Sequence, residues 1–174
     1  MMCKKKFPKI SIVTPSLNQG LYLESAIKSV LSQNYPNLEY IIIDGGSTDN
    51  SVEIIKKYAQ HLHFWCSEAD AGHYSAVNKG FANASGDIFA WLNSDDMYCP
   101  DAFRTVAAIF SQFPEVSWLT TLQQLVWDSQ GHRKLVKFIP GYSKQAFLDG
   151  RYITRKFSGL GYIQQESTFW RREL

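Results

Sequence analysis

Short apolar runs alternate with amphipathic stretches along the first 113 residues of the chain. The segments Ile10–Val13, Tyr40–Ile43 and Ile88–Leu92 are apolar almost throughout, which is typical of strands covered on both faces. A fourth strand is predicted at Leu62–Cys66. Strands that alternate with helices predict a doubly wound, mostly parallel α/β sheet. Apolar residues at helical spacing predict the helices, which contain Leu23–Leu31, Val52–Ala59, Tyr74–Ala82 and Phe103–Phe110.

The pattern changes after Pro114. Residues 116–127 and 135–139 are strand-like, and the turn sequence Asp128–Gly131 joins them, which predicts an antiparallel hairpin added to the parallel half. We therefore expect three parts: a basic N-terminal tail at residues 1–9, a ligand-binding α/β half at 10–113, and a second half at 114–174.

Composition narrows the function classes. The chain has 174 residues, is 45% hydrophobic and has a net charge of +2, which predicts a globular domain and argues against a nucleic-acid binder. Its three widely spaced cysteines indicate neither a disulfide framework nor a zinc site and fit a reducing compartment. Neither a signal peptide nor a membrane span is recognised, so a cytoplasmic protein is expected. The basic run Lys4–Lys6 is either a solvated tail or a weak contact with the inner membrane surface.

Carboxylates collect where the predicted strands end. Asp44 closes one strand, and Asp95 and Asp96 follow another. Ligands of open α/β sheets bind outside the carboxyl ends of the strands. Carboxylates that converge there repel one another unless a cation compensates them, and Mg²⁺ or Mn²⁺ carrying phosphates is a natural solution. A single aspartate at such a place usually caps a turn, but the set favours a ligand site.

Asp95 and Asp96 are consecutive, so their side chains point in opposite directions on an extended chain. We therefore expect one to bind a metal and the other to face a sugar or ribose hydroxyl. Asp49 is interpreted as a helix cap, and the role of His73 beside the expected cleft is left open. The sequence contains no GxSxG, P-loop or GxGxxG motif, which removes the usual hydrolase, ATPase and dehydrogenase interpretations.

Six motifs follow one another along the chain: Ser11–Asn18, Ile42–Asp49, Ser67–Gly72, Asn78–Gly80, Ala84–Asp87 and Leu92–Asp96. Together and in this order, they resemble those of the family-2 glycosyltransferases with the GT-A fold. The subgroup to which the chain is most similar makes bacterial O-antigen and other surface polysaccharides.

The resemblance implies inverting transfer from a nucleotide sugar, expected to be a UDP-sugar, to a saccharide or lipid-linked acceptor. It implies that Asp44 accepts from the base, that Asp95 faces the ribose or sugar, and that Asp96 binds the metal, Mn²⁺ or Mg²⁺. The remaining implied nucleotide-sugar-binding residues are Thr14, Pro15, Ser16 and Asn18, which line the pocket, and Asp70, Asn78 and Lys79, which border the base and diphosphate.

Inversion requires a carboxylate as general base. In the family this base follows a segment resembling Ser167–Arg172, so we expect it beyond Leu174 and the GT-A-like fold to be C-terminally truncated. Glu166 precedes that segment and does not match the base position. A truncated domain that binds nucleotide sugar without turnover is therefore the alternative. A sugar-phosphate nucleotidyltransferase is disfavoured, because Thr14–Asn18 lacks the glycine-rich basic loop that such enzymes carry.

Overall fold

The computed structural model describes residues 7–128, 132–138, 141–149, 152 and 163–174. The basic run Lys4–Lys6 and the centre of the predicted hairpin turn lie outside the described residues. Within the described ranges, none of the helices has both the length and the apolar character needed to cross a bilayer.

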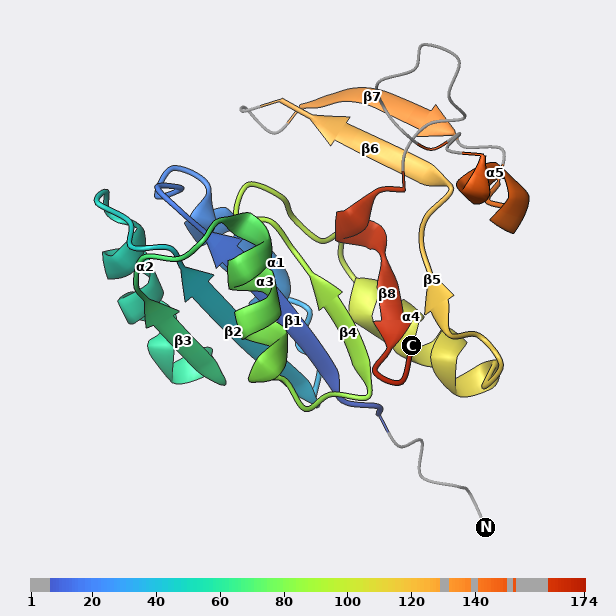
Figure 1. Ribbon diagram of the computed structural model, residues 1–174, viewed down its shortest axis with the longest axis horizontal. Helices are drawn as coiled ribbons and strands as arrows, with labels where there is room; N and C mark the ends of the chain where they lie inside the picture. Colours follow the sequence, from blue (N-terminus) through green and yellow to red (C-terminus); the bar gives the residue numbers. More distant parts are fainter. Residues whose placement is uncertain (1–6, 129–131, 139–140, 150–151, 153–162) are drawn as a thin grey trace. The chain divides into compact units, whose positions relative to one another are not determined.

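Helices and strands alternate in the order that the hydrophobic pattern predicts (Figure 1). The strands are β1 (Ile10–Ser16), β2 (Leu38–Asp44), β3 (Phe64–Ser67), β4 (Ile88–Trp91), β5 (Trp118–Leu119), β6 (Gln123–Trp127), β7 (Arg133–Phe138) and β8 (Phe169–Arg171). The helices are α1 (Leu23–Leu31), α2 (Ser51–Tyr58), α3 (His73–Ala82), α4 (Ala102–Gln112) and α5 (Lys144–Leu148), with 3-10 turns η1 (Ala59–His61) and η2 (Gln165–Ser167).

One six-stranded sheet organises the fold, in the order β3-β2-β1-β4-β8-β5. β1 pairs in parallel with β2 and β4, and β3 extends the parallel part beside β2. β8 and β5 add the antiparallel edge next to β4. The expected α/β class, a doubly wound and mostly parallel sheet with an antiparallel extension, is confirmed.

The origin of the antiparallel extension differs from the sequence prediction. The predicted hairpin exists, but β6 and β7 form a two-stranded sheet of their own and do not add to the parallel sheet. The predicted strand at residues 116–127 is divided into β5 and β6. β5 instead pairs with β8, where Trp118 lies opposite Trp170. This pairing joins residues about fifty positions apart, so no local sequence pattern can predict it.

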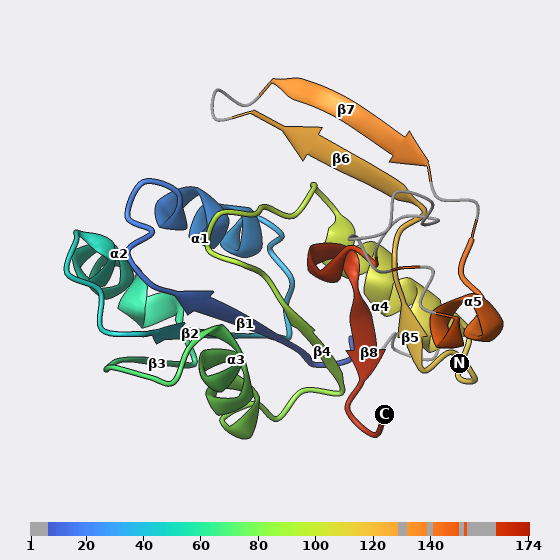
Figure 2. The same ribbon diagram turned by 45° about the horizontal axis from the view of Figure 1, so that its top comes forward.

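The sheet is covered on both faces, as its apolar strands require (Figure 2). Ile12, Ile42 and Ala90 belong to the core cluster that α1, α2 and α4 cover. Their strand neighbours Val13 and Ile41 face the opposite side, in the cluster that includes residues of α3. Successive residues of a strand point to opposite faces, which explains why neither face of β1, β2 or β4 carries a polar stripe.

The chain divides into two compact units. The first contains the described residues up to Leu119 together with Phe169–Leu174, and so holds the whole six-stranded sheet. The second, Thr120–Thr168, holds the β6–β7 hairpin, α5 and η2.

A buried carboxylate ties the amino-terminal edge of the sheet together. Glu39 is 1% exposed and accepts from Lys9 Nζ at 2.8 Å, Ser11 Oγ at 2.5 Å, and Ser85 N and Oγ at 2.6 and 2.8 Å. Burial raises the pKa of Glu39, but these hydrogen bonds outweigh it and lower the pKa to about 2. The ionised carboxylate therefore fastens β1, β2 and the α3–β4 loop at the edge opposite the carboxyl ends.

Candidate functional site

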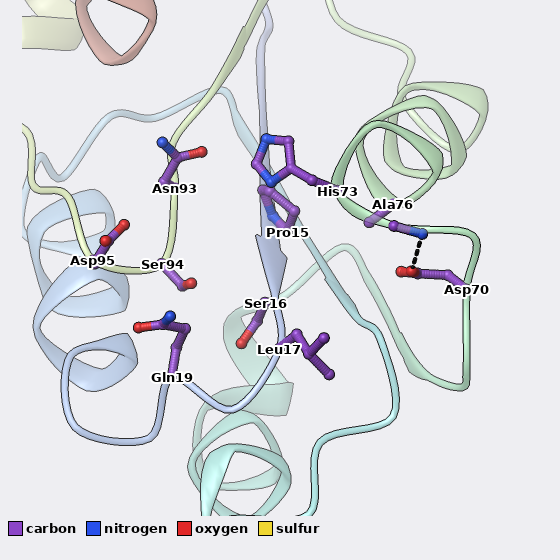
Figure 3. Close-up of a pocket in the computed structure, with 11 residues that line it drawn as sticks. Pro15, Ser16, Leu17, Gln19, Asp70, His73, Ala76, Asn93, Ser94 and Asp95 are labelled. Carbon is purple, nitrogen blue, oxygen red and sulfur yellow. Dashed lines mark hydrogen bonds between the residues drawn. The ribbon is translucent and has the colours of Figure 1, made fainter.

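A pocket of about 320 Å³ lies in the first unit at the carboxyl ends of β1 and β4. Three chain segments form it: the end of β1 with the following loop, the start of α3, and the loop after β4 (Figure 3). Its lining residues are Pro15, Ser16, Leu17, Gln19, Asp70, Gly72, His73, Ala76, Asn93, Ser94 and Asp95. This is the edge of the sheet at which open α/β proteins bind ligands.

Ser16 ends β1 inside this pocket. It is 5% exposed, and its hydroxyl has no hydrogen-bond partner among the residues that the structure describes. Buried polar groups are normally paired, so an unpaired hydroxyl in a pocket wall is a candidate ligand contact. The predicted residues Thr14 and Asn18 are not among the lining residues. The buried Thr14 Oγ1 lies 3.1 Å from the hydroxyl of Tyr40.

Asn18 fastens the loop after β1 to the loop after β2. Its Oδ1 accepts from Thr48 N at 2.8 Å, and its own backbone N–H donates to Ser47 Oγ at 2.8 Å. Its φ of 53° lies in the left-handed region, which asparagine tolerates better than most residues. Asn18 therefore fixes the conformation of the loop after β1, beside the pocket.

Asp44 lies at the end of β2 and is fully buried. Its carboxylate accepts from Ser47 N at 2.8 Å, Gly46 N at 3.2 Å, Ser47 Oγ at 2.5 Å and Ser67 Oγ at 2.7 Å. Asp44 is not among the lining residues of the pocket, so its contact with a base stays a prediction. In the structure it organises the loop after β2. A Cβ at Gly45 of that loop would lie 3.2 Å from Asp70 Oδ2, so the loop passes close to the pocket.

The segment between β3 and α3 brings Asp70 and His73 into the pocket. Asp70 Oδ1 accepts from Gly72 N at 2.7 Å (Figure 3). Gly72 has a φ of 108° and a ψ of 178°, a combination that only glycine adopts readily, and α3 begins at the next residue. Asn78 and Lys79 lie further along α3 and do not line the pocket. Asn78 is exposed, and Lys79 forms an ion pair with Glu68.

The loop after β4 supplies the other acidic wall. Asp96 N donates to Asn93 O at 3.1 Å, so the four residues from Asn93 to Asp96 form a turn. The extended segment assumed here from the sequence is not observed. The exposed Asp95 lines the pocket, whereas Asp96 lies outside the lining and accepts from Asn93 Nδ2 at 3.2 Å. Asn93 Oδ1 is buried and accepts no hydrogen bond from the residues described.

The donors around this turn suit a divalent cation that is shared with a phosphate ligand. Among the residues that the structure describes, no group of three or more His, Cys, Asp or Glu side chains is placed to hold a metal by itself. Mg²⁺ and Mn²⁺ sites at phosphates commonly use only one or two protein carboxylates, and Asp95 and Asp96 meet that requirement. The residues present therefore fit a divalent cation of this kind.

Sequence reasoning located part of this site. Of the predicted nucleotide-sugar residues, the structure brings together Pro15, Ser16, Asp70 and Asp95. It also adds lining residues that were not predicted, namely Leu17, Gln19, Gly72, Ala76, Asn93 and Ser94, and it places His73 among them. Three of them, Leu17, Gln19 and Ser94, immediately adjoin predicted residues. Ala76 was missed because the apolar positions taken to predict this helix were Tyr74, Val77, Phe81 and Ala82; Val77 is buried as expected, but Tyr74 is 75% exposed.

The chain is similar in sequence to known proteins. The family described as "Glycosyl transferase family 2" matches residues 11–167. An uncharacterized glycosyltransferase of Mycobacterium tuberculosis (strain H37Rv) is 35% identical over 150 residues, which are 84% of this chain and 55% of that protein.

Two solved structures are similar in fold. Staphylococcus aureus TarS 1-349 in complex with UDP-GlcNAc has a TM-score of 0.66 and 18% identity, covering 94% of this chain and 45% of that one. The mannosyltransferase PcManGT of Pyrobaculum calidifontis, in complex with GDP-Man and Mn²⁺, has a TM-score of 0.65 and 17% identity, covering 97% and 46%. The fold is therefore GT-A-like, and the chain spans about half the length of the proteins compared here.

Proposed function

The chain belongs to glycosyl transferase family 2, and we propose that it carries the donor-binding part of an inverting glycosyltransferase. The donor is a nucleoside-diphosphate sugar, with UDP as the first nucleotide to test. The acceptor is a saccharide or a lipid-linked saccharide in surface polysaccharide synthesis. The observation that carries this proposal is the pocket at the carboxyl ends of β1 and β4, which Asp70 and Asp95 enter from separate loops.

The solved structures support the donor class. One was determined with UDP-GlcNAc and the other with GDP-Man and Mn²⁺, although both are under 25% identical to this chain. We assign the base end of the donor to the side of Asp70, where the loop organised by Asp44 approaches. Thr14 and Asn18 act by positioning the loops, and Asn78 and Lys79 border the same end from α3.

We assign Asp96 as the metal-binding carboxylate and Asp95 as the residue that faces the ribose or sugar. A bound Mn²⁺ or Mg²⁺ would supply Lewis-acid stabilisation of the negative charge that builds up on the departing nucleoside diphosphate. The protein's part is to hold the donor in place. Asn93 contributes by accepting the Asp96 N–H with its carbonyl and donating its amide to the Asp96 carboxylate, which fixes the turn. Asp95 is thereby presented to the pocket.

Inverting transfer also needs a carboxylate to take the proton of the attacking acceptor hydroxyl. We do not assign this role to Glu166, because it does not match the position of the base in the family. Its carboxylate accepts hydrogen bonds from the amides of Gln164 and Gln165. The acceptor and its base are left to experiment.

Thermal unfolding with UDP, UDP-GlcNAc and GDP-Man, each with and without Mn²⁺, tests the proposal. We expect one nucleotide family to raise the melting temperature and Mn²⁺ to raise it further. Asp96→Ala should abolish the metal-dependent part, while Glu115→Ala, which removes an exposed carboxylate elsewhere, should retain it. A metal-dependent shift that survives Asp96→Ala refutes the metal assignment. No shift of the unchanged protein with any nucleotide refutes the donor pocket.

A further inference from the structure

His73 lies in the pocket between its two acidic sides. Asp70 lines one side, and the turn of Asn93 and Asp95 lines the other (Figure 3). The imidazole extends from the start of α3 toward the ends of β1 and β4. Its ring lies edge-on to the ring of Tyr74, at 5.4 Å between centroids.

Charge makes this position informative. The lining residues include the carboxylates of Asp70 and Asp95, and they include neither lysine nor arginine. His73 is thus the one basic side chain among the described residues that line the pocket. The nearby cation Lys79 is paired with Glu68 and does not line it. An anionic ligand entering between two carboxylates needs compensating donors, and within the lining only His73 offers a side chain that can carry positive charge.

The backbone around His73 supports the same ligand. α3 is 10 residues long and begins at His73, with Gly72 as its N-cap residue. The first N–H groups of a helix have no intrahelical acceptor, and a helix N-terminus favours an anion.

A second, independent feature is the Ser16 hydroxyl, which is buried in the same pocket and has no partner within the described part of the chain. A phosphate oxygen would accept from it. Side chain, helix start and hydroxyl come from α3 and β1, so two separate elements present donors to one pocket.

We propose that His73, with the first turn of α3, binds the diphosphate of the donor and thereby determines selectivity for nucleoside diphosphates over nucleosides. This inference rests on the proposed donor site. The diphosphate is the middle of a nucleotide sugar, and His73 lies between the side of Asp70, to which we assign the base, and the side of Asp95, to which we assign the sugar. The proposal adds His73 to the residues, Lys79 among them, that the resemblance implies at the base and diphosphate.

Comparison of a nucleoside with its diphosphate tests the proposal. Dissociation constants for uridine and UDP, or for guanosine and GDP if the protein prefers guanine, are measured by NMR titration and calorimetry with EDTA present. His73→Ala should weaken diphosphate binding by about tenfold, the scale of one charge-assisted hydrogen bond, and leave nucleoside binding within about twofold. The ratio of the two constants, and not overall affinity, is the readout, because a purely structural change would weaken both ligands together.

Two variants serve as controls. Tyr74→Leu removes the ring that contacts His73, and His61→Ala removes an exposed histidine outside the pocket lining. Both should keep the ratio of the unchanged protein. If His73→Ala weakens nucleoside and diphosphate equally, or Tyr74→Leu reproduces its effect, His73 does not bind the diphosphate. If the unchanged protein binds neither diphosphate, the proposed donor site itself fails, and this inference fails with it.

Discussion

Replacing Asp44 separates its structural role from any contact with a ligand. The buried carboxylate accepts hydrogen bonds from two backbone N–H groups, of Gly46 and Ser47, and from the hydroxyls of Ser47 and Ser67. Asp44→Ala leaves these donors without their acceptor. We expect this substitution to destabilise the protein even when no nucleotide is present.

The geometry sets the size of the effect. Hydroxyls can turn toward other acceptors, whereas the N–H groups of Gly46 and Ser47 are fixed by the loop. A hydrogen bond to a charged group contributes about 1.5–3 kcal/mol, so losing two gives a decrease of about 3–6 kcal/mol in the free energy of unfolding. Asp44→Asn keeps one oxygen, which can face three of the four donors at Oδ2, and should lose about 1–2 kcal/mol.

Urea unfolding without ligand measures both variants, with Asp95→Ala as the matched control. Asp95 is exposed in the pocket, and its removal should change the free energy of unfolding by about 0.5 kcal/mol or less. Equal stabilities of Asp44→Ala and Asp95→Ala would refute the assignment of Asp44 as the organiser of its loop.

Three further substitutions address other parts of the unit. Glu39→Gln should remove a pH dependence: the pKa of Glu39 is lowered from 4.5 to about 2, so its contribution of about 3 kcal/mol is present above pH 4.5 and lost as pH falls toward 2. Urea unfolding at pH 3 and pH 6 measures this loss. Gly80→Ala should cost about 1–3 kcal/mol of unfolding free energy in urea, because a Cβ there would collide with the side chain of Val13. Ser16→Ala should leave the free energy of unfolding unchanged or raise it by up to about 1 kcal/mol, yet weaken UDP binding in calorimetry, because its hydroxyl has no partner among the described residues.

The outcomes that contradict these predictions are equally definite. If Glu39→Gln loses as much stability as the unchanged protein between pH 6 and pH 3, another carboxylate is responsible. A stabilised Gly80→Ala would mean that helix propensity outweighs the contact with Val13. A Ser16→Ala variant that unfolds more easily would show that its hydroxyl has a structural partner.

The parallel part of the fold could be predicted because burial on both faces leaves a local signal. β1, β2 and β4 appear in the sequence as apolar runs, and the helix that contains Gly80 was predicted from the helical spacing of its apolar residues. The strand β8, and its pairing with β5 inside the predicted segment 116–127, could not be predicted, because three residues carry no periodicity and the pairing depends on distant partners. Tyr74 was used as an apolar position to predict α3, but the side of α3 that packs closely against the sheet carries the small residues Ala76 and Gly80 instead.

For the site, strand ends indicated where carboxylates gather but not what surrounds each one. The same reasoning selected Asp44 and Asp95. In the structure Asp44 is buried among hydrogen-bond donors of its loop, whereas Asp95 is exposed in the pocket. Which hydrogen-bond donors meet a carboxylate depends on loops that are far apart in sequence. Similarly, the Asn93–Asp96 turn is closed by a backbone hydrogen bond that no residue pattern specified.

A crystal structure of the protein grown with UDP and Mn²⁺, or with GDP and Mn²⁺ if thermal unfolding selects guanine, tests the donor pocket most directly. Anomalous diffraction from manganese then locates the cation independently of the nucleotide. We predict the diphosphate beside His73 and the manganese at the turn that carries Asp95 and Asp96. Nucleotide density at the opposite edge of the sheet, near Asp87 and Arg172, with manganese away from Asp96, would contradict the account.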